Sequence, residues 1–188
     1  MAIYRPIVID DEIKFSKKKF IVSKTDLKGK IIFTNKNFCE ISGYNEAELV
    51  GINHNLLRHP DMPKAVFFLV WQNLLAGNKV TGLVKNLAKT GQYYWVIADF
   101  EAKKDANGNL TALTAFRRAA PQDAIDAAEE LYATMLSIEK KHGMDKSLAY
   151  LDAFLEEKDV SYAEFIEELT KPKGLLATLL SSFKRMFS

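Results

Sequence analysis

Two of the three histidines in this chain lie in a short segment that also holds an arginine and an aspartate. All four side chains of this group, His54, Arg58, His59 and Asp61, can donate or accept hydrogen bonds, and imidazoles also bind metals or haem iron. A zinc site needs three or four ligands, and the single Cys39 falls in a predicted helix, so a structural metal is not expected. Arg58 and Asp61 belong either to a polar binding site or to a pair that only orders the segment.

Common catalytic motifs are missing from the sequence. It contains no Gly-rich phosphate loop, no His-Glu-x-x-His, no Cys-x-x-Cys and no Gly-x-Ser-x-Gly elbow. A dinucleotide fingerprint is missing too, which disfavours a flavin reductase that oxidises nicotinamides. We therefore expect a binding protein and not an enzyme.

The histidine-containing segment needs neighbouring elements to position it. Residues 52–63 show no periodicity and include two prolines, which predicts a loop. A helix is predicted from Pro63 to Gly77, because apolar residues including Trp71 recur at steps of three and four. Trp71 therefore belongs either to the core or to a ligand wall, and its helix is expected to pack on a sheet.

Strand patterns lie on both sides of this helical region. Two short β-branched runs, 20–23 and 30–34, flank a turn that ends in Gly29, which predicts a hairpin. Three longer runs follow the helix at 80–87, 93–103 and 110–117, separated by short turn sequences. Connections this short favour an antiparallel sheet. The predicted fold is α+β, a five-stranded antiparallel sheet with helices on one face.

Beyond Pro121 the sequence changes character. Residues 121–170 show helical apolar stripes and carry a net charge of −9, whereas residues 1–120 carry +7. Residues 175–187 form a short apolar helical pattern with basic residues near its end, which suits a membrane surface or a partner helix, with packing inside the same chain as the alternative. The predicted organisation is an N-terminal cap (1–19), a sensor domain (20–120), an acidic helical appendage (121–170) and an amphipathic basic tail (171–188).

Overall charge and hydropathy restrict the class of partner. The net charge of +2 does not favour nucleic-acid binding. The N-terminus lacks the apolar run of a signal peptide, and no stretch approaches the ~20 apolar residues that cross a bilayer. A cytoplasmic location is expected, with membrane association only peripheral or through another protein.

A series of short motifs between about residues 20 and 118 resembles the PAS domain of the bacterial aerotaxis receptor family. The motifs are Asn35, Ser42-Gly43-Tyr44, Glu48-Leu49-x-Gly51, His54-Asn55, Arg58-His59-Pro60-Asp61-Met62-Pro63, Trp71, Gly77, Val84-Lys85-Asn86 and Tyr94-Trp95-Val96. They occur in the family's order, which makes the resemblance specific. The acidic tail further resembles short, soluble energy-taxis PAS proteins of epsilonproteobacteria.

The resemblance implies a noncovalent FAD sensor of redox state. Arg58 would face the diphosphate, and His59 and Asp61 would fix the loop or reach the ribose and adenine. The other implied FAD contacts are His54, Asn55, the amides of Asn35 and Asn86, and the indoles of Trp71 and Trp95. The implied partner is a separate membrane-bound chemotaxis transducer, and a homodimer is compatible with the same function.

Two departures from the family pattern keep other ligands open. Val80-Thr81-Gly82 stands where the family usually has Trp-x-Gly, and Leu87-Ala88 stands where two arginines usually follow Val-Lys-Asn. An aromatic stacking partner and nearby positive charge are therefore missing from these positions. Haem held by His54 or His59 and a cofactor-free interaction module remain alternatives.

Overall fold

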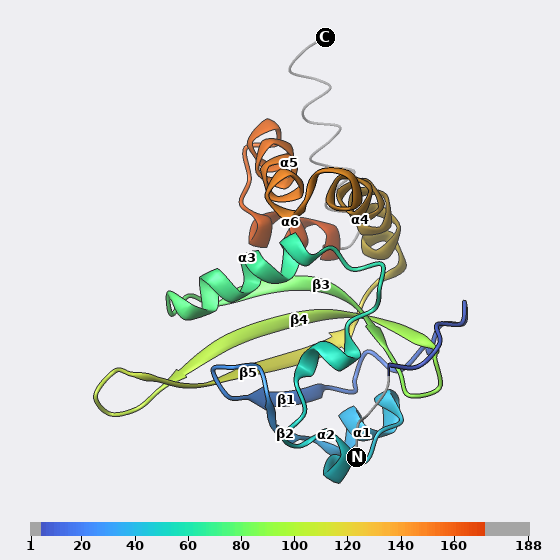
Figure 1. The fold of residues 1–188 in the computed structure, drawn as a ribbon, viewed down its shortest axis with the longest axis vertical. Coiled ribbons are helices and arrows are strands. Elements are labelled where there is room, and N and C mark those ends of the chain that lie inside the picture. The colour runs from blue at the N-terminus through green and yellow to red at the C-terminus, as the bar shows by residue number, and fades with distance from the viewer. Residues whose placement is uncertain (1–4, 172–188) are drawn as a thin grey trace.

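The core of the protein is one five-stranded antiparallel sheet, shown in Figure 1. We describe residues 5–171 from a computed structural model. The strands are β1 (Ile21–Thr25), β2 (Ile31–Thr34), β3 (Val80–Leu87), β4 (Tyr93–Lys104) and β5 (Leu110–Ala119). Their order across the sheet is β2-β1-β5-β4-β3, and every neighbouring pair is antiparallel. The predicted α+β fold is confirmed.

Helices between β2 and β3 cover one face of this sheet. They are α1 (Lys36–Ser42), α2 (Glu46–Leu49), the 3-10 turn η1 (His54–Leu57) and α3 (Lys64–Leu75). Asn35 begins α1 because its side chain accepts a hydrogen bond from the backbone N–H of Phe38. Gly43 ends α1 with a φ of 74°, a left-handed conformation that favours glycine.

Strand register decides which side chains face these helices. Asn86 pairs with Tyr94 on the helix-covered face, and the next pair along the strands, Lys85 with Trp95, lies on the opposite face. Both pairs are almost completely buried. The opposite face must therefore also be covered where β3 and β4 meet.

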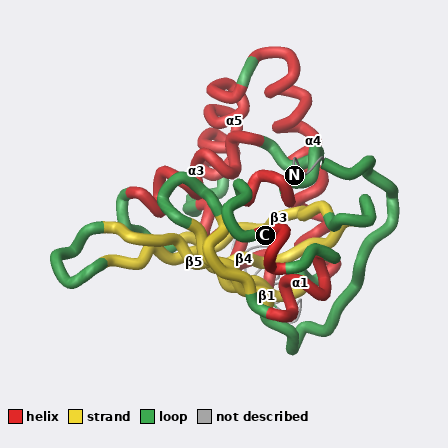
Figure 2. The backbone as a smooth tube through the Cα atoms, turned by 60° about the horizontal axis from the view of Figure 1, so that its bottom comes forward, coloured by secondary structure: helices red, strands yellow, loops and turns green. Residues whose placement is uncertain are grey.

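The acidic appendage supplies that cover. It consists of α4 (Gln122–His142), α5 (Met144–Glu157) and α6 (Tyr162–Thr170), and Figures 1 and 2 show it beside β3 and α3. The Tyr132 hydroxyl donates to the Leu83 carbonyl at 2.9 Å and lies 2.9 Å from the Tyr162 hydroxyl. The appendage is thus docked on the sensor domain, and its core is continuous with that of the domain.

The N-terminal segment pairs with the turn between β3 and β4. The backbone N–H of Ile13 donates to the Tyr93 carbonyl at 2.7 Å, and that of Ile9 donates to the Gly91 carbonyl at 2.9 Å. Gly91 has a φ of 92°, and an added Cβ would collide with the backbone of Ile7. The predicted amphipathic tail, 175–187, lies outside the described residues.

Candidate functional site

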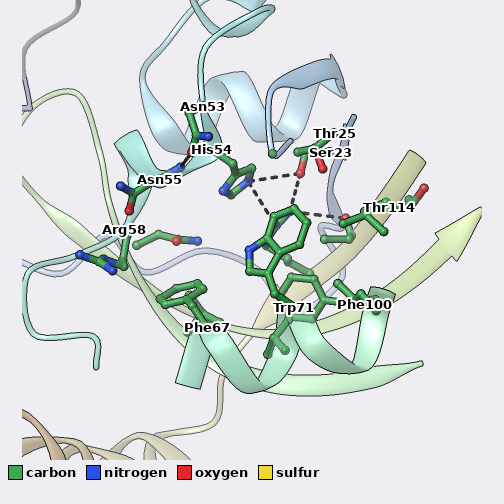
Figure 3. A pocket seen from close by; sticks show the side chains of 18 residues that line it. Ser23, Thr25, Asn53, His54, Asn55, Arg58, Phe67, Trp71, Phe100 and Thr114 are labelled. Carbon is green, nitrogen blue, oxygen red and sulfur yellow. Dashed lines mark hydrogen bonds between the residues drawn. The ribbon is translucent and has the colours of Figure 1, made fainter. Parts of the chain in front are cut away.

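A cavity of about 260 Å³ lies between the inner face of the sheet and the covering helices (Figure 3). Its size is close to the lower end of the ~300–1,000 Å³ that small-molecule sites usually span. Its lining residues come from four strands, the turn between β1 and β2, the loop around η1, and α3: Ser23, Thr25, Gly29, Asn53, His54, Asn55, Arg58, Phe67, Val70, Trp71, Leu74, Val84, Asn86, Phe100, Leu113, Thr114, Ala115 and Arg117. The cavity is apolar on most sides, with polar groups gathered at the loop and at β5.

Aromatic side chains form one wall. Phe67 and Trp71 project into the cavity from α3, and Phe100 joins them from β4 (Figure 3). Val80, which stands where the family usually has tryptophan, offers no aromatic ring, but α3 contributes the rings of Phe67 and Trp71 to this wall. These rings can enclose a flat aromatic ligand.

Loop residues form the polar side of the cavity. The Asn53 side chain accepts a hydrogen bond from the backbone N–H of Asn55 at 2.9 Å, which begins η1. The backbone of Arg58 then forms an isolated antiparallel β-bridge with Asn86 of β3. The Arg58 guanidinium lies 5.9 Å from the centroid of the Phe67 ring. The Arg58 Nε atom is buried without a hydrogen-bond partner, and burial lowers the pKa of this guanidinium. The loop thus presents an incompletely satisfied cation to the cavity.

Asn86 carries a second unsatisfied donor. Its side chain is buried and lines the cavity, yet its Nδ2 atom has no hydrogen-bond partner. A buried amide N–H without an acceptor costs about 1–3 kcal/mol, so a ligand that supplies an acceptor gains affinity here. Asn86 and Arg58 therefore fit a ligand with several acceptor atoms.

The third polar group was missed at the sequence level. Arg117 on β5 is only 3% exposed and donates to Ser23 Oγ at 2.9 Å and to the Ala115 carbonyl at 3.4 Å. Its second terminal nitrogen lies 3.0 Å from Nε2 of His54. Consecutive strand residues point to opposite faces, so the pair Arg117 and Arg118 already required one arginine to point inward.

His54 is a neutral ring in this environment. Arginine has no acceptor, so Nε2 of His54 must accept the hydrogen bond and the proton must sit on Nδ1. Burial and the charge of Arg117 lower the pKa of His54 to about 3. Iron bound at Nδ1 would move the proton to Nε2, toward the N–H groups of Arg117, which disfavours His54 as a haem ligand.

Five of the nine sequence-predicted residues line the cavity, and four do not. His54, Asn55, Arg58, Trp71 and Asn86 belong to the lining. Asn35 lies at the start of α1, where it also accepts from the backbone N–H of Val22 at 3.1 Å and donates to the Phe20 carbonyl at 2.9 Å. It holds β1 against α1 and does not face the cavity.

Asp61 and Trp95 lie toward the appendage, and His59 packs edge-on against Tyr93 with 5.7 Å between ring centroids. Nδ1 of His59 accepts from the backbone N–H of Asp61 at 3.1 Å, and the Asp61 carboxylate pairs with Lys85 at 3.1 Å. Trp95 stacks on Tyr132 of α4 with 6.4 Å between ring centroids. These three residues order the loop and the contact with the appendage, and none of them lines the cavity.

Two contacts join the walls of the cavity to α4. The Glu139 carboxylate accepts from the backbone N–H of Ala65 at 2.8 Å, at the first turn of α3. Glu129 lies 3.7 Å from the ammonium of Lys85, the residue before Asn86 on β3. A displacement of α3 or β3 therefore reaches α4 directly.

Within residues 5–171 no group of three metal-ligating side chains is assembled. In the same part of the chain, no helix is long and apolar enough to cross a membrane.

Comparison with solved structures supports the fold. A light-oxygen-voltage domain, from work on a flavin analogue, matches with a TM-score of 0.52 at 22% identity, over 59% of this chain and 83% of that one. A PAS domain from Colwellia psychrerythraea matches with a TM-score of 0.51 at 23% identity, over 55% and 87%. At such identities the likeness establishes the architecture alone.

Sequence comparison identifies the family. Residues 31–117 match the model of the PAS fold. The aerotaxis receptor of Escherichia coli is 36% identical over 130 residues, 69% of this chain and 26% of the receptor. The biofilm dispersion protein BdlA of Pseudomonas aeruginosa is 33% identical over 94 residues, 48% of this chain and 22% of that protein. This chain spans about a quarter of these relatives and contains a PAS domain of the aerotaxis receptor family.

Proposed function

We propose that this protein is a redox or energy-taxis sensor that binds FAD noncovalently in the cavity and signals to a separate membrane-bound chemotaxis transducer. The observation that carries the proposal is the pair of buried donors without acceptors, Arg58 Nε and Asn86 Nδ2, in a cavity walled by aromatic rings. FAD offers a planar ring with several acceptors and an anionic diphosphate. The cavity residues can bind such a ligand, which supports a sensing role over an enzymatic one.

Each cavity residue has a role in this proposal. FAD, when bound, supplies a ring system that accepts and returns electrons. Phe67 and Trp71 would enclose the ring, and Arg58 would offer paired N–H donors to the diphosphate. The Asn86 amide can both donate and accept, so rotation of this amide can follow a change in the protonation of the ring.

The signal would leave through the walls of the cavity. Asn86 and Lys85 are neighbours on β3, so a shift of the strand at Asn86 also moves the Lys85 contact with Glu129. A shift of α3 would alter the hydrogen bond between Ala65 and Glu139. The appendage would then present a different surface to the transducer.

The cofactor is tested by the visible spectrum of the purified full chain and by extraction of any chromophore. We expect flavin absorption and release of FAD on denaturation. Arg58→Ala should weaken FAD binding by about 1.5–3 kcal/mol, through loss of a charge-assisted contact. Arg118→Ala is the matched control, since Arg118 pairs with Asp99 at 2.7 Å and does not line the cavity.

Three results would argue against this function. Colourless protein that takes up no added FAD would favour a cofactor-free interaction module. A Soret band would favour a haem sensor. Equal FAD affinity of Arg58→Ala and wild type would assign Arg58 to loop ordering alone.

Signalling is tested with Asn86→Leu. We expect this variant to fold and to lose any redox-dependent change in binding to membranes that contain the transducer.

Deletion of residues 174–188 tests the tail separately. The truncated protein should keep its cofactor but move from the membrane fraction to the supernatant in cells that contain the transducer. If the truncated and full-length proteins fractionate alike, the tail does not tether the protein to the membrane.

A further inference from the structure

Arg117 is a buried cation without a carboxylate partner. Its side chain lines the cavity, and the residue is 3% exposed. Its hydrogen-bond partners are a serine hydroxyl, a backbone carbonyl and a histidine ring, all of them neutral. Among residues 5–171 no aspartate or glutamate lies within ion-pair distance of Arg117. The positive charge is therefore not neutralised within the described chain.

Two cations outside the cavity, Lys85 and Arg118, have carboxylate partners. Lys85, which is 7% exposed, lies near the carboxylates of both Asp61 and Glu129. Arg118, the next residue after Arg117, pairs with Asp99 at 2.7 Å on the other face of the sheet. A buried charge without a counter-ion is strongly unfavourable, so the unpaired and almost fully buried Arg117 needs an explanation.

Groups around Arg117 cannot supply the missing negative charge. His54 accepts a hydrogen bond from Arg117 as a neutral ring. The nearby Tyr94 phenol has its pKa raised by burial, so it stays uncharged. The remaining charged residue of the lining, Arg58, is itself a cation. The Phe38 and Phe100 rings, each with its centroid 5.8 Å from the guanidinium, contribute only weak cation–π attraction.

We propose that the β5 end of the cavity binds a negatively charged or anion-forming edge of a planar ligand, with Arg117 as the counter-ion and His54 and Ser23 as the groups that orient the guanidinium. The chemical class is a flat aromatic molecule with a carboxylate or with a ring edge of electron-rich carbonyl and nitrogen acceptors. A flavin ring belongs to the second type, so the inference deepens the proposed function. It does not require FAD.

The test compares two probes of the same shape and different charge. Full-length protein, freed of any bound chromophore and checked for its fold by circular dichroism, is titrated with 2-naphthoate and with the neutral 2-naphthamide. We expect naphthoate to bind at least about tenfold more tightly, as a charge-assisted hydrogen bond predicts. Arg117→Gln should abolish this preference, whereas Arg118→Gln should preserve it. Arg117→Lys, which keeps the charge, should retain part of it.

Equal affinity of the two probes for wild-type protein would overturn the inference, even if Arg117→Gln failed to fold. A preference that persists in Arg117→Gln would overturn it as well. FAD binding to the same preparations separates this inference from the proposed function. Naphthoate preference without FAD uptake would leave the anion site standing and remove FAD. FAD uptake without naphthoate preference would support the proposed cofactor and remove the anion site at Arg117.

Discussion

The two faces of the sheet neutralise buried charge in different ways. On the appendage side, Lys85 lies near Asp61 and Glu129, and Arg118 pairs with Asp99. On the cavity side, Arg58 and Arg117 form no ion pair within residues 5–171, although both line the same cavity. Lys85 and Arg118 on the appendage side are thus paired with carboxylates of the folded chain, while Arg58 and Arg117 on the cavity side are available to an anionic ligand.

Neutral polar groups without partners occur on both sides, since Trp95 Nε1 and His59 Nε2 are unpartnered as well as Asn86 Nδ2. The Tyr132 hydroxyl of the appendage satisfies the Leu83 carbonyl and the Tyr162 hydroxyl. The Asn86 amide in the cavity keeps an unpartnered Nδ2 atom. The Tyr132 contacts therefore stabilise the fold, whereas the Asn86 amide is expected to act mainly on binding.

The largest expected effect concerns the appendage core. Leu151 of α5 is fully buried, so Leu151→Ala should lower the free energy of unfolding by about 2–5 kcal/mol. Urea denaturation measures this loss, and FAD titration of the folded variant should give wild-type affinity. Leu75→Ala is the control, since Leu75 is 53% exposed and its removal should cost little. A comparable loss in both variants would contradict the assignment of Leu151 to the core.

Acid should destabilise the cavity side through His54. Its pKa is about 3 in the folded protein, against 6.5 for an ordinary histidine, so the neutral ring favours the folded state. The contribution is complete above pH 6.5, falls by about 1.4 kcal/mol per pH unit below that, and is lost by about pH 3. His54→Gln, whose amide oxygen can still accept from Arg117, should therefore lose less stability between pH 7 and pH 5.

This difference is measured by urea denaturation at several pH values. His142→Gln should keep the wild-type pH dependence, because His142 is exposed. Identical pH slopes for His54→Gln and wild type would show that His54 is not the group responsible.

The comparison of neutral groups is sharpened by two matched deletions of a polar group. Tyr132→Phe leaves the Leu83 carbonyl and the Tyr162 hydroxyl without this partner and should cost about 1–3 kcal/mol of stability. Asn86→Leu replaces an unpartnered amide by an apolar side chain of similar size and should be neutral or slightly stabilising without ligand. Thermal denaturation of both variants tests the difference, and the reverse order would contradict the assignment of Tyr132 to stability and Asn86 to binding.

The smallest expected effect concerns Glu129. It is half exposed and lies 3.7 Å from Lys85, which keeps Asp61 as its nearer partner. Glu129→Gln should therefore change stability by no more than about 1 kcal/mol. Glu101→Gln, which breaks the exposed pair with Lys79, is the control and should behave alike. A much larger loss at Glu129 would mean that Lys85 depends on both carboxylates.

Local sequence patterns determined the order and type of the elements. The alternating apolar runs of β3–β5 and the helical spacing of α3 were predicted close to their observed bounds, because both patterns depend on neighbouring residues. The polar loop from His54 to Pro63 was also identified as the densest group of binding residues. Three side chains of this loop, His54, Asn55 and Arg58, line the cavity, together with the predicted Trp71 and Asn86 from other elements.

Only the tertiary structure decided which member of each adjacent pair faces the cavity. Arg58 and not His59, Asn86 and not Lys85, and Arg117 and not Arg118 belong to its lining. Consecutive residues of an extended chain point to opposite sides, and the sequence gives this alternation without its absolute direction. The direction follows from how β3–β5 pair and from which helices cover each face, since burial of the apolar surface on both sides fixes the register.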